Sequence, residues 1–454
     1  MIKKSDTRLI IALALPAVFQ TLTKSSFSLI DSFWVGKLGS VQLASITVST
    51  FLVWGIISLA EIISNGTNSL VAQSTGAGNK ELSKKISTLN IQTTLFYSFI
   101  VGIALLPVLK YLYDIIDLNA QNRIYCNDYL ISFLFGLPCV LLLSTVTSVF
   151  RGYGDTKTPF YLLIVSAVLN FLFCPLLIFG VNGFLRFEVQ GAALSTLLAY
   201  LISFFIGLYI LKKRGLISRI IVFNFDKKII FETFRIGFPL ALNGVAFSMI
   251  YVFVSRFVAQ YGDTGLAALG IGHRSESIAY QVCVGFAMAA TIMVGQYMGA
   301  GKPEEANKFA WKIVRIGAVP VLIYTIILFI FSADFAKIFT TNPDVIYHAS
   351  YYNKLSALVM IFTMLETILT GAFAGSGYTS PPAITGLVFN FLRIPACALF
   401  SSLWGLEGIW FAICLSVFVK GVVLSLWFKK GSWKKMKFRL GQTNEGIGKA
   451  MEIE

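Results

Sequence analysis

Residues 73–78 read Gln-Ser-Thr-Gly-Ala-Gly, and residues 296–301 read Gln-Tyr-Met-Gly-Ala-Gly, 223 positions later. The same offset relates residues 152–159, which follow the pattern Gly-x-Gly-x-Thr-x-x-Pro, to residues 375–382. Shorter matches at this offset pair Pro16 with Pro239, Gly39 with Gly262 and Leu43-Ala44 with Leu266-Ala267. Later, Asn170-x4-Pro175 matches Asn390-x4-Pro395 at an offset of 220. The chain therefore contains two copies of one unit in tandem.

The composition places both copies in a membrane. Of the 454 residues, 56% are hydrophobic and 13% are charged, and the mean hydropathy is +0.76. In soluble domains, roughly a quarter of the residues are charged. This composition excludes a disordered or nucleic-acid-binding chain and argues against a soluble enzyme.

Each copy contains six apolar segments, and a membrane-spanning helix needs about 20 residues. The predicted spans are 8–36, 46–74, 87–109, 126–150, 159–180, 190–211, 233–258, 267–297, 311–332, 348–372, 383–403 and 408–428. Because six is even, both copies enter the membrane from the same side. We expect an all-α integral membrane protein with two parallel six-helix lobes, related by a pseudo-two-fold axis along the membrane normal.

The basic residues give the orientation and the domain limits. Of the 37 Lys and Arg residues, 26 lie in the connections on the side of the amino terminus and 5 on the opposite side. By the positive-inside rule, both termini are cytoplasmic and the protein lies in the cell membrane. The predicted domains are lobes at 1–211 and 233–428, a basic cytoplasmic linker at 212–232 and a cytoplasmic tail at 429–454.

This architecture favours a carrier of small molecules over a channel or an enzyme. Two parallel lobes with a cavity between them are typical of alternating-access carriers, and no re-entrant filter or polar ring is visible. The six cysteines form no CxxC pair and indicate neither a disulfide nor a metal site. No nucleophile–base constellation recurs. We expect no cofactor other than a coupling ion, no nucleic-acid partner, a lipid environment and a monomer.

Apart from five at the beginning of a span (Arg8, Asp128, Arg235, Lys312 and Arg315), ten charged side chains lie inside the predicted spans. They are Lys24, Arg256, Arg274, Lys354, Arg393, Lys420, Asp31, Glu61, Glu276 and Glu366. A charge in the bilayer costs at least about 2.5–3.5 kcal/mol, so such residues face a cavity or a partner. For three of them near span ends, Arg256, Lys354 and Lys420, we expect the charged group to snorkel to the interface.

Asp31 is the leading candidate for ion coupling. Gln20, Lys24, Ser28 and Asp31 follow a helical spacing that places them on one stripe of the first span. Desolvation favours the neutral acid, so a carboxylate there can take up and release a proton, or hold Na⁺. The alternative is a fixed ion pair with Lys24, but seven helical residues separate the two by about 10 Å.

Polar residues of other spans are predicted to lie at about the same depth in the membrane as Asp31. Asn170, Cys174 and Thr196, in the fifth and sixth spans, are predicted to share the ion site with Asp31. The candidates for cavity lining are Gln20, Lys24, Glu61, Asn65, His273, Glu276, Tyr280 and Glu366. For His273 and Glu276, a structural network with Arg274 and a proton relay both remain open. The other His, His348, lies on another span, so these two residues do not form a zinc site.

These motifs together resemble the multidrug and toxic compound extrusion (MATE) family over nearly the whole chain. The resemblance rests on Pro16, the stretch Asp31-Ser-Phe-Trp-Val-Gly36, the glycine loop at 152–156 and their second copies. It implies export of organic, often cationic and amphipathic compounds in exchange for H⁺ or Na⁺. It assigns the coupling role to Asp31 and supporting roles to Asn170 and Thr196.

The sequence departs from the family pattern at two acidic positions. Many relatives have Asn-x-x-x-Asp-Pro in the fifth span, whereas this chain has Cys174 before Pro175. The acid that some relatives carry in the seventh span is replaced by a stretch with Asn243, which we expect to line the cavity. Because Na⁺ prefers hard oxygen ligands, these changes favour H⁺ over Na⁺ at Asp31.

Two other classes of membrane protein are alternatives to a drug antiporter. A lipid or lipid-linked oligosaccharide flippase of the same superfamily would carry several deep basic residues, and only Lys24, Arg274 and Arg393 qualify. A membrane scaffold without transport has no sequence feature in its favour.

Overall fold

The structure, a computed structural model, describes residues 4–116, 120–180, 185–218 and 225–441, and these form helices without any strand. In the first half the helices are α1 (Lys4–Val35), α2 (Ser40–Ala60), α3 (Ile62–Gly76), α4 (Lys80–Ile116), α5 (Ala120–Phe135), α6 (Leu137–Gly152), α7 (Lys157–Phe179) and α8 (Glu188–Lys213). In the second they are α9 (Lys227–Ala259), α10 (Gly262–Gly299), α11 (Pro303–Ile330), α12 (Ser332–Lys337), α13 (Pro343–Ser376), α14 (Ser380–Lys430), and the short η2 (Ser432–Lys435) and η3 (Arg439–Gly441). Helices satisfy their own backbone groups, as a bilayer requires.

The all-α membrane fold predicted from the sequence is confirmed. Nine of the described helices are long and apolar enough to cross a membrane, and the number is ten if the pair α5–α6, which bends by 50°, counts as one broken span. The second predicted span is broken at Glu61 into α2 and α3. Parts of the predicted linker (219–224) and tail (442–454) lie outside the described residues.

The last two predicted spans are joined in α14 across a sharp kink. Trp404 and Gly405 have non-helical backbone angles, and Gly405 has φ 61° and ψ −139°. That combination is open essentially only to glycine, because it has no Cβ. The kink therefore divides α14 into the two predicted spans.

The described chain divides into two compact units. We call Phe19–Ala241, with the segment from Phe438, the amino-terminal unit, and residues up to Val18 with Leu242–Lys437 the carboxy-terminal unit. The boundaries fall inside α1 and inside α9, and the repeat offset also relates Val18 to Ala241. Each unit thus takes the first part of one helix from the other sequence repeat. The lobe limits drawn from the sequence stay a prediction.

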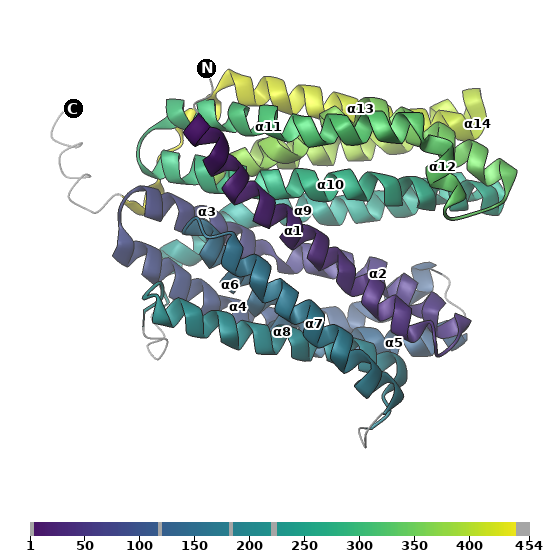
Figure 1. Cartoon of the computed structure of the whole chain (residues 1–454), viewed down its shortest axis with the longest axis horizontal. Helices are drawn as coiled ribbons and strands as arrows, with labels where there is room; N and C mark the ends of the chain where they lie inside the picture. Colours follow the sequence, from purple (N-terminus) through teal and green to yellow (C-terminus); the bar gives the residue numbers. More distant parts are fainter. Residues whose placement is uncertain (1–3, 117–119, 181–184, 219–224, 442–454) are drawn as a thin grey trace. The chain divides into compact units, whose positions relative to one another are not determined.

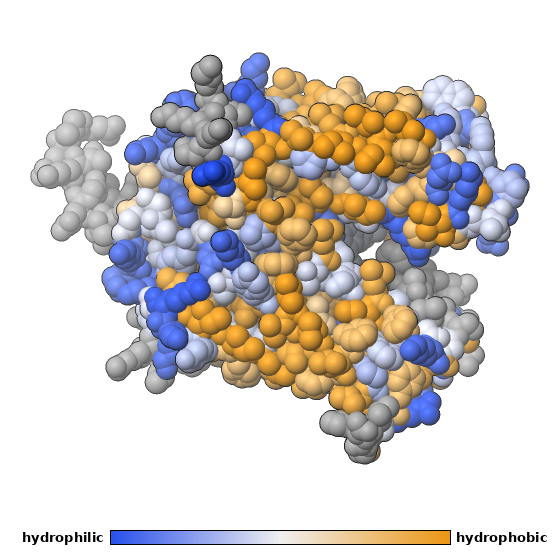
Figure 2. All heavy atoms as spheres, viewed as in Figure 1, coloured by the Kyte–Doolittle hydropathy of each residue, from blue (hydrophilic) through white to orange (hydrophobic). Residues whose placement is uncertain are grey.

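Each unit packs around its own apolar core. In the amino-terminal unit α7 lies along α8, and α3 packs on α6 (Figure 1). In the carboxy-terminal unit α10 lies along α13, and the first part of α1 contributes Ile10 and Ala14 to the same core. Figure 2 shows hydrophobic surface along the middle of the helices and hydrophilic residues near their ends, as a lipid-facing protein requires.

Candidate functional site

Asp31 lies buried inside the amino-terminal unit, at 4% exposure, on the last turns of α1. Its Oδ2 accepts from the Tyr129 hydroxyl at 3.5 Å and from Thr196 Oγ1 at 3.4 Å. Its Oδ1 accepts from Asn170 Nδ2 at 3.4 Å. No basic side chain pairs with Asp31 among the described residues. The carboxylate is therefore surrounded by neutral donors alone.

The supporting residues are also bonded to one another. Asn170 Nδ2 donates to Thr196 Oγ1 at 2.8 Å and to Ser195 Oγ at 3.2 Å. The Cys174 sulfur lies 3.0 Å from Ser195 Oγ and donates to Asp31 Oδ1 at 3.6 Å. The structure thus brings Asp31, Asn170, Cys174 and Thr196 together, and their shared role in ion binding stays a prediction. Asn170 Oδ1 is buried and has no hydrogen-bond partner in the described chain. This oxygen could therefore bind an ion.

Tyr129 and Ser195 belong to this site but were not predicted from the sequence. Tyr129 is 6% exposed and lies on α5, and Ser195 is fully buried on α8. Serines and tyrosines are common in apolar helices, so neither residue stands out by type. One available signal was the repeat, because its main offset relates Tyr129 to Tyr352.

Lys24 pairs with Glu61, so it is not the partner of Asp31. Lys24 Nζ donates to Glu61 Oε1 at 2.7 Å, and the two side chains are 47% and 27% exposed. Glu61 sits at the break between α2 and α3. Charged groups in a span are costly unless they are paired or face a cavity, and each of these two charges has the other as its partner.

The remaining amino-terminal candidates are less closely connected. Gln20 is 5% exposed, and its Oε1 has no hydrogen-bond partner within the described residues. Asn65 is half-buried on α3, one turn from Glu61. Neither side chain contacts Asp31 directly.

In the carboxy-terminal unit, Glu276 Oε1 accepts from the Tyr352 hydroxyl at 3.0 Å. His273, one turn earlier on α10, packs its ring edge-on against Tyr251, with ring centres 4.5 Å apart. Arg274 does not join a network with them. It is exposed, and its guanidinium lies 5.1 Å from the centre of the Phe339 ring.

Glu366, which is partly exposed, and Lys420 form an ion pair at 3.0 Å. Lys420 is 4% exposed, so the prediction that it snorkels to the interface is wrong. Lys420 pairs with Glu366 inside the unit instead, and this pairing offsets the cost of burying a lone charge. Two further candidates, Asn243 and Tyr280, are respectively half-buried and 43% exposed.

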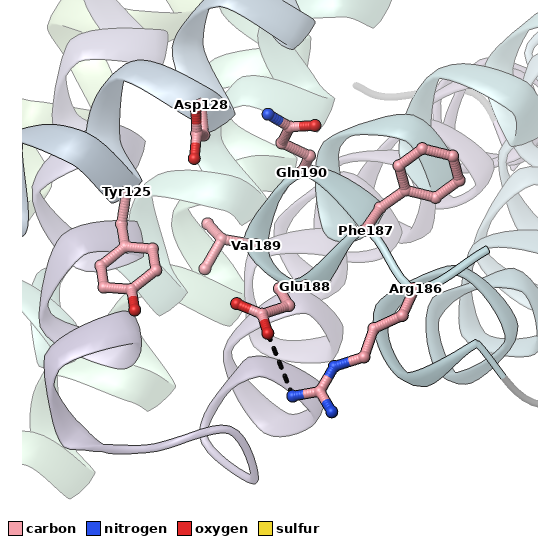
Figure 3. Close-up of a pocket in the computed structure, with 7 residues that line it drawn as sticks. All are labelled: Tyr125, Asp128, Arg186, Phe187, Glu188, Val189 and Gln190. Carbon is pink, nitrogen blue, oxygen red and sulfur yellow. Dashed lines mark ion pairs between the residues drawn. The ribbon is translucent and has the colours of Figure 1, made fainter.

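A cavity of about 300 Å³ opens in the amino-terminal unit, where α5 meets the start of α8 (Figure 3). It is lined by Tyr125, Asp128, Arg186, Phe187, Glu188, Val189 and Gln190. Arg186 pairs with Glu188 at 3.1 Å, and Asp128 is the residue before Tyr129. The cavity therefore lies next to the helix turn that carries one of the Asp31 donors.

Comparison with known proteins gives the family. The family model described as MatE matches residues 16–176 and 239–399, two segments that are again related by the repeat offset. A probable multidrug resistance protein NorM from Thermotoga maritima is 27% identical, over 94% of this chain and 93% of the relative. An FAD transporter from Shewanella oneidensis is 26% identical, over 91% of this chain and 92% of the relative.

Among solved structures, a MOP superfamily transporter from Pyrococcus furiosus superposes with a TM-score of 0.87. It is 21% identical, and the match covers 95% of this chain and 97% of that one. The fold and the repeated motifs thus define a multi-pass membrane transporter. The chain belongs to the MatE family, that is, the MATE transporters, as its motifs had indicated.

Proposed function

We propose that this protein is a secondary antiporter that exports organic, amphipathic and often cationic compounds in exchange for protons. The observation that carries the proposal is Asp31, a buried carboxylate held by hydroxyl, amide and thiol donors without a basic partner in the described chain. Multidrug resistance proteins among the relatives support the substrate class. We further propose that it acts in the cell membrane, as a monomer with both termini cytoplasmic.

The proposed coupling step is neutralisation of Asp31. A proton on Oδ2 removes the charge and makes this oxygen a donor, so its contacts with Tyr129 and Thr196 must rearrange. Asp31 and Pro16 lie on the same helix, and that helix contributes residues to both compact units. A local change at Asp31 can thus alter how α1 packs in each unit. The ion drives export only if it binds the two orientations with different affinity.

Proton coupling is preferred to Na⁺ coupling because of Cys174. The site offers oxygen atoms from Asp31, Thr196, Ser195 and Asn170, but a thiol occupies the position 3.6 Å from Asp31 Oδ1. A thiol is a poor Na⁺ ligand, and one carboxylate alone attracts a cation less strongly than two. Na⁺ at Asp31 remains the second candidate ion.

Uptake of a fluorescent organic cation into everted vesicles tests the proposal. Vesicles receive a pH gradient or a Na⁺ gradient separately, and transport is followed for the wild type, Asp31→Asn and Asp263→Asn, the last changing an exposed acid. We expect the pH gradient alone to drive transport, and only Asp31→Asn to abolish it. If neither gradient changes the rate of transport, the antiporter proposal is contradicted. If only the Na⁺ gradient drives transport, the choice of the proton as the coupling ion is wrong.

A second candidate function is the transport of a flavin nucleotide or a lipid-linked anion. A relative with nearly full coverage is described as an FAD transporter, which favours an anionic substrate. Uptake of labelled FAD in the same vesicles, unaffected by excess organic cation, would support this alternative.

A further inference from the structure

The second repeat contains counterparts of some residues of the Asp31 site, but not of its carboxylate. The repeat relates Tyr129 to Tyr352 at its main offset and Asn170 to Asn390 at the shorter one. Tyr129 and Asn170 both contact Asp31. In the carboxy-terminal unit, the position equivalent to Asp31 is Val254, which is fully buried. The second copy of the site has therefore lost its central carboxylate.

A guanidinium lies beside this second copy. Arg393 follows Asn390 by one helical turn on α14 and is 1% exposed. Its Nε donates to Ser416 Oγ at 2.8 Å. Its Nη1 has no hydrogen-bond partner in the described chain. A buried donor without a partner is costly, and a charged one more so.

No described acid of this unit is in direct contact with Arg393, although the charges of Glu276 and Arg393 interact over a longer distance. Glu366 is taken by Lys420 at 3.0 Å, and Glu276 accepts from Tyr352 at 3.0 Å. Among the described residues, no carboxylate forms an ion pair with Arg393. The guanidinium instead faces two rings of α9, with its centre 5.4 Å from Tyr251 and 6.0 Å from Phe247. Cation–π contact offsets only part of the cost of burying a charge.

A second unsatisfied group lies on the same aromatic cluster. His273 packs edge-on against Tyr251 at 4.5 Å between ring centres, and its Nε2 has no hydrogen-bond partner in the part of the chain described. His273, Tyr251 and Phe247 are only partly buried, whereas Arg393 lies behind them. The rings that contact the guanidinium are therefore themselves partly exposed.

We propose that Arg393 is the anchor of a binding site in the carboxy-terminal unit for an anionic group, a carboxylate or a phosphate, of the transported compound. The anion receives the free Nη1–H of Arg393 and replaces the contact with Tyr251 and Phe247, whose rings then pack on the apolar body of the compound. Arginine suits this role because its planar fork binds two oxygens at once. Substrates of this carrier therefore include compounds with an acidic group. This inference rests on the proposed transport function and refines its substrate class.

A pair of flavins that differ by one phosphate tests the site. Riboflavin 5′-phosphate and riboflavin share the fluorescent ring system, so fluorescence anisotropy measures both on the full-length protein in nanodiscs of neutral lipid. We expect wild-type protein to bind the phosphate at least tenfold more tightly. Arg393→Gln should remove that preference, so that the two flavins bind this variant with equal affinity, and Arg393→Lys should retain part of it. Arg256→Gln, which changes an exposed arginine on α9, should have no effect.

Three outcomes would overturn the proposal. One is equal binding of the two flavins by the wild type, and another is a full phosphate preference in Arg393→Gln. The third concerns lipid: if nanodiscs of anionic lipid abolish the preference by competition, the site takes a phospholipid headgroup and not the substrate. Monodispersity of each variant on size exclusion controls for folding, and Arg393→Lys gives a readout if Arg393→Gln misfolds. The binding measurement uses no ion gradient. A negative result would therefore contradict the Arg393 site without contradicting the antiport proposal, which the vesicle assay tests separately.

Discussion

The contacts of Asp31 are numerous but long. Its four donors lie at 3.4–3.6 Å from the carboxylate oxygens. Strong O–H···O bonds to a carboxylate are roughly 2.5–2.7 Å long. By contrast, the bond between Asn170 and Thr196, two of its neighbours, is 2.8 Å. The neighbours of Asp31 are thus bonded to one another more closely than to its carboxylate, and the proposed ion uptake rests on this arrangement.

Changing Cys174 to Asp should alter the ion that drives transport. The new carboxylate would stand beside Asp31 Oδ1 and Ser195 and supply the hard oxygen ligands that the thiol withholds. We expect transport by Cys174→Asp to gain a dependence on the Na⁺ gradient, measured in everted vesicles at constant pH. Cys174→Ser is the control: it adds an oxygen but no second negative charge, so it should respond to Na⁺ much less than Cys174→Asp does. Insensitivity of the Asp variant would show that Cys174 does not decide ion choice.

The residues of this site differ in how visible they are in the sequence. Asp31 stands out because an acid in an apolar span is costly, and the motifs around it resemble a known family. Tyr129 was missed, since a tyrosine in a span costs little and carries no periodic signal. Arg393 was recognised as a charge in a span, but its neighbours Ser416 and Tyr251 depend on how the helices pack. Sequence patterns show how deep a residue lies in a span and on which face of its helix, but they do not show which residues of other helices it contacts.

At the scale of elements, the close approach of α3 and the first part of α9 depends on glycine. A Cβ on Gly237 would lie 1.9 Å from the carbonyl oxygen of Ile62, and one on Gly66 would lie 2.2 Å from the carbonyl oxygen of Thr233. Both clashes are with backbone, which cannot rotate away. These two glycines let the helices pack backbone to backbone, as small residues do in membranes.

Gly237→Val should therefore destabilise the amino-terminal unit. Overpacking of this kind costs about 1–3 kcal/mol or more, since α9 must move away from α3. The measurement is thermal unfolding of the purified protein in detergent. Gly270→Val is the matched control, because a Cβ on Gly270 on α10 meets nothing within 4 Å. Equal unfolding temperatures for the two variants would contradict the assigned packing.

The start of α7 is stabilised by the loop that carries the repeated glycines. Asp155 Oδ1 accepts from the backbone N–H groups of Lys157 and Thr158, and its Oδ2 pairs with Arg214 at 2.7 Å. Burial opposes ionisation of Asp155, but the bonds from Thr158 and Arg214 outweigh it and hold the pKa of this carboxyl below its usual value. The ionised form of Asp155 therefore stabilises the folded state.

Asp155→Asn should lower stability by about 0.5–2 kcal/mol at neutral pH, as the loss of a helix cap does. Since the folded pKa is the lower one, this stabilisation is complete above the ordinary pKa of about 3.9 and disappears as the pH falls through the folded value. Thermal unfolding should thus show a constant gap between wild type and variant from about pH 5 to 8, which narrows below about pH 4. A gap that narrows already between pH 6 and 5 would exclude Asp155 as its source.

The breaks inside elements were only partly predictable. Gly136 and Pro138 flank the 50° bend between α5 and α6, and a Gly-x-Pro sequence is a readable signal for such a bend. The break at Glu61 between α2 and α3 has no comparable residue. It coincides instead with the ion pair to Lys24, a contact between helices that hydropathy does not record.

At the scale of the whole molecule, the duplication is the feature that the sequence defines best. Its main offset recurs in the family match and in the spacing of the two unit boundaries. The sequence does not show that α1 divides between the units after Val18, and α9 after Ala241. A repeat records which residues are alike, whereas the units are defined by contacts such as those of Ile10 with the core around α10.

The central claim, that Asp31 exchanges a proton for the transported compound, is tested most directly by counting protons released on binding. Purified protein in weakly buffered detergent is titrated with an organic cation while a pH-sensitive dye reports free protons. The account predicts release approaching one proton per molecule bound by the wild type, with none from Asp31→Asn and an undiminished signal from Asp263→Asn. Release from Asp31→Asn equal to that of the wild type would contradict it.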